Sequence, residues 1–354
     1  MNIAFVSNGT EDRPRSSAIR SYRMALELRK RGHNTEFFPD IYPKNFPGGR
    51  FGPEKLFLRR FVSRTRQLRQ LQGYDIVYIN KYIIDPYYVP PVFTYVLKNV
   101  LGKTIVLDTC DPIWDGAGSG VDRRLELSDA VVVSGPELAT YAGQFTDSVS
   151  VVPMSIDTKR FRPRTENGDG ADGDNPVVGW VGHGPNYKQY IERVIPVLER
   201  LAEDIDFTFF LTSAQNDSGV YELFDGVGFN CDIRDWVPEG ELVATINTFD
   251  VGMVPLRSTE WARGKSPIKI LEYNACGVPV VASNVGDTRE MVEHGKNGFL
   301  AEDEDEWYEY LRLLLTDEGR QKKMGKQARQ QTLEEYSYAA NAERLETVLA
   351  DILS

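Results

Sequence analysis

The sequence predicts an α/β protein with two domains, each built on a parallel, doubly wound β-sheet. The chain has 354 residues, which is long for a single hydrophobic core. Short apolar runs alternate with amphipathic stretches, the pattern of repeated strand–helix units. A Gly- and Asp-rich segment, residues 165–175, interrupts the alternation, which then restarts. We therefore expect a first domain over 1–164, a flexible linker over 165–175, a second domain over 176–336 and a terminal helix over 337–354.

Composition and charge narrow the class of protein. A formal net charge of −11 argues against a nucleic-acid-binding protein, which would carry a basic surface. The cysteines Cys110, Cys231 and Cys276 show neither disulfide nor zinc-ligand spacing, so a reducing compartment is expected. No signal-peptide pattern precedes the first strand, and no apolar run approaches the length of a membrane span. These observations predict a cytoplasmic protein.

The first half of the chain opens with a strand–helix–strand unit. An apolar run rich in Ile, Phe and Val at residues 2–7 predicts a buried parallel strand. Ser16 or Ser17 can cap the following helix, and Gly32 ends it before a second strand at 34–38. The later apolar runs predict further strands at 75–80, 104–107, 130–134 and 149–153.

An arginine-rich amphipathic helix is predicted between residues 51 and 72. Its apolar residues, Phe61 and Val62 among them, recur at helical spacing and predict a face that packs on the sheet. The arginines on the remaining surface could bind an anionic membrane or a lipid phosphate. The alternative is a domain helix with solvated arginines. The arginines proposed for a membrane surface are Arg59, Arg60 and Arg64.

Charged residues gather where strands of the first sheet are predicted to end. Asp108 and Asp111 follow the strand at 104–107, and the carboxyl ends of parallel strands form the ligand-binding edge of such sheets. Either carboxylate could orient or deprotonate an acceptor hydroxyl, although Asp111 could instead cap the next turn. Arg15 and Arg20, after the first strand, could bind a phosphate of donor or acceptor, or be solvated.

Residues 265–283 form the segment that organises the second half. Ser266 predicts a helix N-cap, with Pro267 at the first helical position. Gly277 ends the helix, and the apolar run at 278–282 predicts a buried strand. The sequence therefore predicts a helix whose N-terminus lies at the carboxyl edge of the second sheet.

This helix suits a nucleoside diphosphate. Its N-terminus offers unpaired N–H groups to phosphate, and Lys265 and Lys269 add positive charge. Glu272 can accept two hydrogen bonds from a ribose diol. The alternative is an amphipathic surface helix with solvated charges. A second phosphate-binding loop is predicted where Gly182 and His183 precede another helix, although His183 could simply cap or pack.

These motifs resemble the retaining GT-B glycosyltransferases of the family-4 type. In that family a Pro-x-Lys-x-x-Glu-Tyr run precedes a small residue, Gly and Pro-Val-Val-Ala-Ser, as at 267–283 here. The resemblance implies that Glu272 binds the donor ribose. The family has a further Glu eight residues earlier, where this chain has Gly264.

The same resemblance assigns three more donor residues. The family's Gly-Arg-x-x-x-x-Lys loop aligns with Gly182, and by spacing His183 takes the Arg position and Lys188 the Lys position. Both family residues bind the donor diphosphate. Val237 lies in the turn that touches the nucleotide base in the family.

The fold and function that the resemblance implies are specific. Two Rossmann-like domains would face each other across a cleft, with the last helix crossing back to the first domain. The protein would be a metal-independent, retaining glycosyltransferase of the hexosyltransferase type, without a cofactor. Its partners would be a nucleotide-diphosphate sugar and a glycan or lipid-linked acceptor. The arginine-rich helix, rather than the resemblance, is the basis for expecting either peripheral attachment to the inner face of a membrane or a purely cytoplasmic protein. The alternatives are an epimerase or hydrolase of the same fold, or a non-catalytic nucleotide-sugar-binding protein.

Overall fold

The computed structural model describes residues 1–7, 16–39, 53–81, 91–112, 119–164, 175–182, 184–238 and 240–353, with the backbone alone for 16–19, 53–59, 119 and 184–187. The chain forms two compact units. Unit 1 comprises Met1–Ser155 and Tyr338–Ser354, and unit 2 comprises Ile156–Ser337. The predicted linker at 165–175 lies almost wholly outside the described residues. The bridge between Ile156 and Ser337 joins the two ends of unit 2.

Unit 1 is built on a six-stranded parallel sheet of order β2-β1-β3-β4-β5-β6. Its strands are β1 (Asn2–Val6), β2 (Asn34–Phe38), β3 (Ile76–Asn80), β4 (Thr104–Thr109), β5 (Ala130–Val133) and β6 (Val149–Val151). Its helices are α1 (Ser16–Lys30), α2 (Pro53–Leu71), α3 (Val92–Tyr95) with a π-helical turn at Val96–Val100, α4 (Ser119–Leu127), α5 (Pro136–Ala142) and α15 (Tyr338–Leu353).

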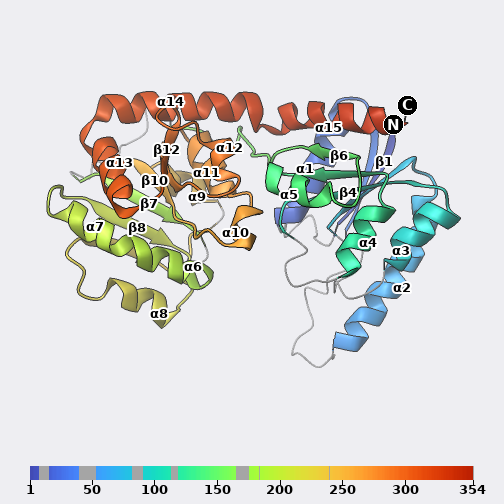
Figure 1. Cartoon of the computed structure of the whole chain (residues 1–354), viewed down its shortest axis with the longest axis horizontal. Coiled ribbons are helices and arrows are strands. Elements are labelled where there is room, and N and C mark those ends of the chain that lie inside the picture. Colours follow the sequence, from blue (N-terminus) through green and yellow to red (C-terminus); the bar gives the residue numbers. More distant parts are fainter. Residues whose placement is uncertain are drawn as a thin grey trace. The chain divides into compact units, whose positions relative to one another are not determined.

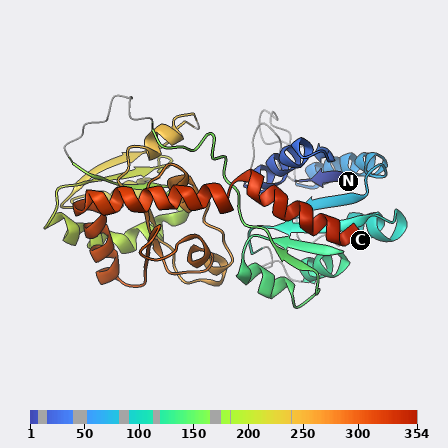
Figure 2. The same cartoon turned by 90° about the horizontal axis from the view of Figure 1, so that it is seen from above.

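Alternate residues of each strand in unit 1 pack into apolar layers on the two faces of the sheet. Ile3 and Phe5 of β1 share one layer with Leu28 of α1, whereas Ala4 and Val6 lie in the other. Both faces are covered, which is why the strands appear in the sequence as continuous apolar runs. The C-terminal helix α15 packs along α1 in the first of these layers, so both chain termini lie in unit 1 (Figures 1 and 2).

Unit 2 has a second six-stranded parallel sheet, of order β12-β11-β10-β7-β8-β9. Its strands are β7 (Val177–Val181), β8 (Thr208–Thr212), β9 (Asn230–Arg234), β10 (Val251–Val254), β11 (Val280–Ser283) and β12 (Gly298–Ala301). Its helices are α6 (Gly184–Ile191), α7 (Ile195–Ala202), α8 (Ser218–Tyr221), α9 (Leu242–Ile246), α10 (Glu260–Arg263), α11 (Ile268–Ala275), α12 (Thr288–Met291), α13 (Glu304–Thr316) and α14 (Glu318–Glu335), with 3-10 turns at Glu192–Val194 and Glu222–Phe224.

Helices cover both faces of the unit 2 sheet. Helices α6 and α7 lie on one side of it, and α11 and α14 on the other (Figure 1).

Two strand glycines allow large rings to approach the sheet closely. A Cβ on Gly179 would lie 2.1 Å from the Phe249 ring, and one on Gly252 would lie 2.4 Å from the Tyr273 ring. Only glycine fits at these two positions without repacking.

The predicted α/β class with two parallel sheets is confirmed. Strands β9 and β12 have weak sequence signals: β9 is a largely exposed edge strand with no apolar run, and β12 has four residues that directly follow a turn. Within the described part of the chain, no helix combines the length and the apolar character needed to cross a membrane.

Candidate functional site

The strand order in unit 2 reverses between β7 and β10. β7 leads to β8 on one side, β10 leads to β11 on the other, and the two strands pair directly. Helix α6 follows β7, and α11 follows β10. Ligands of doubly wound sheets bind at the carboxyl ends of strands at this kind of switch point. The two helices that carry Lys188 and Glu272 therefore begin at the same edge of the sheet.

One carboxylate oxygen of Glu272 lies inside the protein without a hydrogen bond from the described residues. Its side chain is 12 % exposed, and Lys269 Nζ lies 3.5 Å from its Oε2 atom. Oε2 is buried and accepts no hydrogen bond from any described residue. A buried carboxylate oxygen is costly to leave unpaired, so a ligand that donates hydrogen bonds would bind favourably here. The hydroxyls of a ribose diol are donors of this kind.

Tyr273 fixes α11 to the neighbouring strand. Its side chain is fully buried, and its hydroxyl accepts a hydrogen bond of 2.8 Å from the backbone N–H of Val181, the last residue of β7. Burial raises the pKa of Tyr273, so the hydroxyl stays protonated at neutral pH. This bond joins the two sides of the switch point and holds the preceding residue, Glu272, in place.

The predicted cap of α11 is wrong. Ser266 is buried and its hydroxyl donates to the Asp287 carboxylate, while Pro267 occupies the N-cap position without a side-chain cap. Tertiary folding brings the Asp287 carboxylate within reach of the Ser266 hydroxyl, and a hydrogen bond to a charged acceptor is stronger than one between neutral groups. Lys265 lies over the ring of Trp261, with Nζ 4.2 Å from the ring centroid, which is a cation–π contact.

The loop after β7 is only partly described. A Cβ on Gly182 would lie 2.4 Å from the Trp180 ring, so this glycine allows the indole to fold over the strand end. His183 lies outside the described residues. Lys188 lies on α6, and its ammonium sits over Gly219 at the start of α8, 2.5 Å from where a Cβ of that residue would lie.

Val237 lies just past the carboxyl end of β9, at the same edge of the sheet, and is buried. Its neighbour Trp236 is 65 % exposed. Sequence reasoning singled out Val237 and missed this tryptophan, whose indole offers a stacking surface for a planar ring. The donor residues predicted from sequence thus follow strands β7, β9 and β10 of one sheet.

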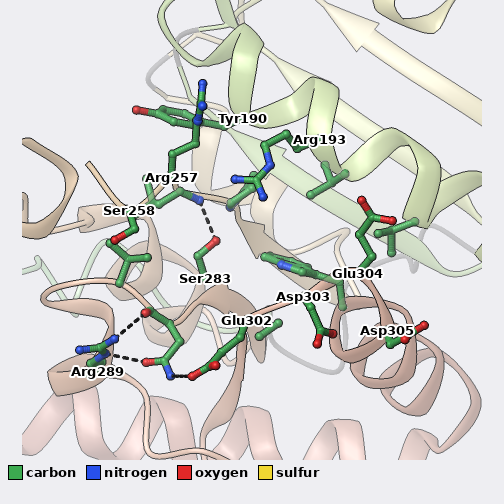
Figure 3. A pocket seen from close by; sticks show the side chains of 18 of the residues that line it. Tyr190, Arg193, Arg257, Ser258, Ser283, Arg289, Glu302, Asp303, Glu304 and Asp305 are labelled. Carbon is green, nitrogen blue, oxygen red and sulfur yellow. Dashed lines mark hydrogen bonds between the residues drawn. The ribbon is translucent and has the colours of Figure 1, made fainter. Parts of the chain in front are cut away.

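A separate cavity of about 730 Å³ lies at the carboxyl ends of β10, β11 and β12 (Figure 3). None of the predicted donor residues lines it within the described chain. Its charged groups are largely paired with protein atoms: Arg200 with Asp305, Arg289 with Asn284, and Asp303 with the N–H of Glu306. Since these groups satisfy one another, the cavity is a weaker candidate for a diphosphate than the switch point.

In unit 1, the predicted site residues Arg20 and Asp108 bind each other. Arg20 Nε lies 2.7 Å from Asp108 Oδ1, and both side chains are buried. Asn80 Nδ2 donates to the other carboxylate oxygen at 2.6 Å. Burial lowers the pKa of Arg20, but the Asp108 carboxylate more than offsets this, so the pKa is raised. This network occupies Asp108 and Arg20 with each other and leaves Asp111 as the more exposed carboxylate.

Asp111 pairs with a lysine that sequence reasoning missed. Lys81 Nζ contacts Asp111 Oδ2, and the two side chains are 12 % and 28 % exposed. Burial raises the pKa of the neighbouring Cys110 thiol to about 11, so this cysteine is a protonated packing residue. Lys81 directly follows β3, but no pattern in the sequence linked it to residues thirty positions later. Arg15 lies outside the described residues.

The predicted membrane arginines are wrong where the structure describes them. Arg60 and Arg64 are 5 % and 2 % exposed. Arg64 turns inward and donates to the carbonyl oxygen of Ser7 at 2.7 Å and of Phe38 at 3.3 Å, at the carboxyl ends of β1 and β2. A carbonyl oxygen has two lone pairs, so each of these two can accept from the guanidinium. The side chain of Arg59 lies outside the described residues.

No group of three or more His, Cys, Asp or Glu side chains in the described part of the chain could hold a metal ion. Independence from metal stays a prediction.

A known family model matches most of unit 2. Residues 175–317 match the family model "Glycosyl transferases group 1". Unit 2 carries a glycosyl transferases group 1 domain. The predicted resemblance to a glycosyltransferase family is thereby confirmed, and the switch-point residues Lys188, Lys269 and Glu272 lie inside the matched region.

Sequence relatives of this chain are distant. It is 28 % identical over 237 residues to D-inositol 3-phosphate glycosyltransferase of Xylanimonas cellulosilytica, covering 59 % of this chain and 54 % of that protein. It is 27 % identical over 256 residues to alpha-maltose-1-phosphate synthase of Mycolicibacterium smegmatis, covering 64 % of each. The chain spans about half the length of most curated relatives that it matches.

Solved structures match the fold over the full chain. Sucrose-phosphate synthase of Thermosynechococcus elongatus superposes with a TM-score of 0.74 at 17 % identity, covering 100 % of this chain and 99 % of that one. Anabaena HepE in complex with UDP-glucose superposes with a TM-score of 0.71 at 15 % identity, covering 99 % and 100 %. The expected GT-B fold is confirmed by these matches.

Proposed function

We propose that this chain is a retaining glycosyltransferase that moves a sugar from a nucleotide-diphosphate sugar to a hydroxyl of a glycan or lipid-linked acceptor without a metal ion. The observation that carries the proposal is the buried Oε2 atom of Glu272, which accepts no hydrogen bond from the described residues, at the switch point of a glycosyl transferases group 1 domain. HepE, with a similar fold, is solved with UDP-glucose, which makes UDP-sugars the first donors to test.

Each donor-binding residue has a chemical role in this proposal. Glu272 accepts hydrogen bonds from the ribose, and the indole of Trp236 offers a surface for the base. Lys188, Lys269 and the N-terminus of α11 stabilise the diphosphate as negative charge builds on it during departure of the sugar. Cationic side chains thereby supply the stabilisation that a metal ion provides in other transferases.

The donor test compares two glutamates with the same lysine spacing. Glu272→Gln removes the buried carboxylate charge, whereas Glu293→Gln removes an exposed one whose Oε2 lies 2.6 Å from Lys296. A hydrogen bond to a charged group contributes roughly 1.5–3 kcal/mol, so we expect Glu272→Gln to weaken UDP binding about 10- to 100-fold in calorimetry. Glu293→Gln should bind like the unaltered protein. Equal affinities of all three proteins would reject the assigned site.

Turnover separates the proposal from its alternatives. A panel of UDP-, GDP- and ADP-sugars is incubated with and without glycan, lipid-linked and phosphorylated polyol acceptors. A transferase releases nucleoside diphosphate only when an acceptor is present. Release or conversion of donor without acceptor would favour an epimerase or hydrolase. Donor binding with no turnover across the panel would favour a non-catalytic binding protein.

We also propose a cytoplasmic protein that attaches to an anionic membrane through unit 1, by a face other than the predicted one. On α2, Phe61 and Val62 are 39 % and 41 % exposed, and Arg66 and Arg69 are exposed on the same side. The ring of Phe61 packs 5.1 Å from that of Phe93 on α3. Exposed apolar side chains beside arginines suit the surface of an anionic bilayer. A basic surface stands out in a chain whose formal net charge is −11. The described cysteines are free thiols, which fits a reducing compartment.

Vesicle sedimentation tests this surface. Arg66→Glu and Phe61→Ser should each reduce binding to phosphatidylglycerol vesicles, and high salt should reduce it further. Val151→Ser is the matched control, because Val151 is 44 % exposed on β6. Equal sedimentation of all variants, or binding that salt does not change, would contradict this surface.

A further inference from the structure

The strand order of unit 1 also reverses, between β1 and β3. β1 leads to β2 on one side, and β3 leads to β4 on the other. Lys81 directly follows β3, and Asp111 follows the adjacent strand β4. Asn80 and Asp108 are register partners at the ends of these strands. The ion pair of Lys81 and Asp111 therefore lies at the ligand-binding edge of the unit 1 sheet.

The backbone of Lys81 is in an unfavourable conformation. Its φ angle is 62°, in the left-handed region, and its N–H donates a 2.7 Å hydrogen bond to the carbonyl oxygen of Asp108. Glycine or asparagine adopts this conformation at lower free-energy cost than lysine. Strained backbone that the surrounding structure imposes is concentrated at functional sites. Here it places the lysine side chain next to Asp111.

The buried side chains at the ends of β3 and β4 are held by hydrogen bonds. Asp108 is held by Arg20 at 2.7 Å and by Asn80 at 2.6 Å, and Arg20 also donates to the carbonyl oxygens of Val152 and Pro153. Asn80 Oδ1 is buried and accepts no hydrogen bond from the described residues. The edge thus offers an unpaired acceptor atom beside the ion pair.

The backbone of Asp111 is also fixed. Thr109 Oγ1 donates to the Asp111 carbonyl oxygen at 2.8 Å. With the main chain held in this way, the remaining freedom of Asp111 is in its side chain, and the Lys81 ammonium is the cation that contacts the carboxylate.

We infer that Lys81 is a positioning residue for the proposed transferase: it holds the Asp111 carboxylate in the orientation that accepts a hydrogen bond from the acceptor hydroxyl. The inference rests on the proposed function. Asp111 touches the acceptor, Lys81 acts through Asp111, and the hydrogen bond of Asn80 to Asp108 joins the ends of the two strands that precede them.

The test is a double-mutant cycle with matched controls. Lys81→Met removes the ammonium and keeps the length of the side chain. Lys98→Met is the control, because Lys98 Nζ lies 3.2 Å from Asp129 in a similar pair, but Asp129 precedes β5 and so lies at the opposite edge of the sheet. Lys81→Arg keeps the positive charge. Lys81→Gln serves as a second neutral variant if Lys81→Met fails to fold.

We expect Lys81→Met to lower kcat roughly 10- to 100-fold, because small displacements of a catalytic group have effects of this size. The dissociation constant of UDP should stay within about twofold, since the donor residues lie in unit 2. In an Asp111→Asn background, Lys81→Met should cause no further loss. Lys81→Arg should recover part of the rate, and Lys98→Met should be as active as the unaltered protein.

Three results would overturn the inference alone. They are full activity of both neutral Lys81 variants, an equal loss of kcat with and without Asp111, and a loss of UDP affinity equal to the loss of kcat. Absence of turnover by the unaltered protein would instead overturn the proposed function, and this inference with it.

Discussion

Replacing Arg20 with leucine is expected to destabilise unit 1 strongly. The guanidinium is 4 % exposed and makes three hydrogen bonds shorter than 3 Å: to Asp108 Oδ1 at 2.7 Å, to the Val152 carbonyl at 2.6 Å and to the Pro153 carbonyl at 2.9 Å. Without it, a fully buried carboxylate keeps only neutral side-chain hydrogen-bond partners among the described residues, Asn80 and Tyr78.

The size of the effect follows from this geometry. Removing one partner of a buried ion pair costs about 3–5 kcal/mol, because the remaining charge stays buried without compensation. Each kcal/mol shifts the melting temperature of a unit of this size by roughly 2–4 °C. We therefore expect the Arg20→Leu variant to lose on the order of 10 °C in the transition of unit 1. Arg31→Leu, which breaks a partly exposed pair with Glu346, should cost less than about 1 kcal/mol.

Two spectroscopic signals distinguish the unfolding of unit 1 from that of unit 2. Circular dichroism follows both, whereas tryptophan fluorescence mainly follows unit 2, because four of the five tryptophans lie between residues 156 and 337. UDP binding by unit 2 should survive in the Arg20→Leu variant. The double variant Arg20→Leu, Asp108→Leu should recover part of the loss, since apolar groups can replace a buried pair. A loss below about 1 kcal/mol for Arg20→Leu would refute the reasoning.

Three further predictions concern unit 2. Gly252→Ala places a Cβ 2.4 Å from the Tyr273 ring and should cost about 1–3 kcal/mol in thermal unfolding, whereas Gly228→Ala, with nothing within 4 Å, should be tolerated. Iodoacetamide at pH 8 should modify the exposed Cys231 and leave the buried Cys276 intact, and mass spectrometry showing both modified in the folded protein would contradict the structure. Burial raises the pKa of Cys276 to about 12, so its contribution to stability is complete below about pH 8.5 and is lost as pH rises toward 12. The Cys276→Ala variant should lose less stability over this range than the unaltered protein in urea titrations, and parallel curves would contradict the assignment.

Apolar runs predicted most of the strands because parallel sheets covered on both faces need continuous runs of apolar residues. A strand that is not buried on both faces needs no such run, so the apolar pattern does not predict it. β9, Asn230–Arg234, is an edge strand with an exposed face, so its sequence carries no apolar run. Helix α14, Glu318–Glu335, has a local start signal instead, because Asp317 caps it by accepting from the N–H of Arg320.

The sequence by itself determined the α/β class, the glycosyltransferase resemblance and the helix that carries Lys269 and Glu272. Tertiary structure decided the partners of individual polar groups. Helical periodicity placed Phe61 and Arg64 on different faces of α2, but the carbonyl oxygens at the ends of β1 and β2 decided that Arg64 turns inward. The same is true of Ser266, whose hydroxyl binds Asp287 rather than its own helix.

Arg20 and Asp108 show why the local sequence does not predict the partners of buried charges. They are 88 positions apart in the chain, and each was a plausible ligand-binding residue from its local sequence. Local patterns record which residues share a face of a helix or strand, since that depends on a repeat of two or 3.6 residues. The partner of a buried charge depends on how distant segments pack, and the need to pair that charge inside the protein is satisfied only when the fold is complete.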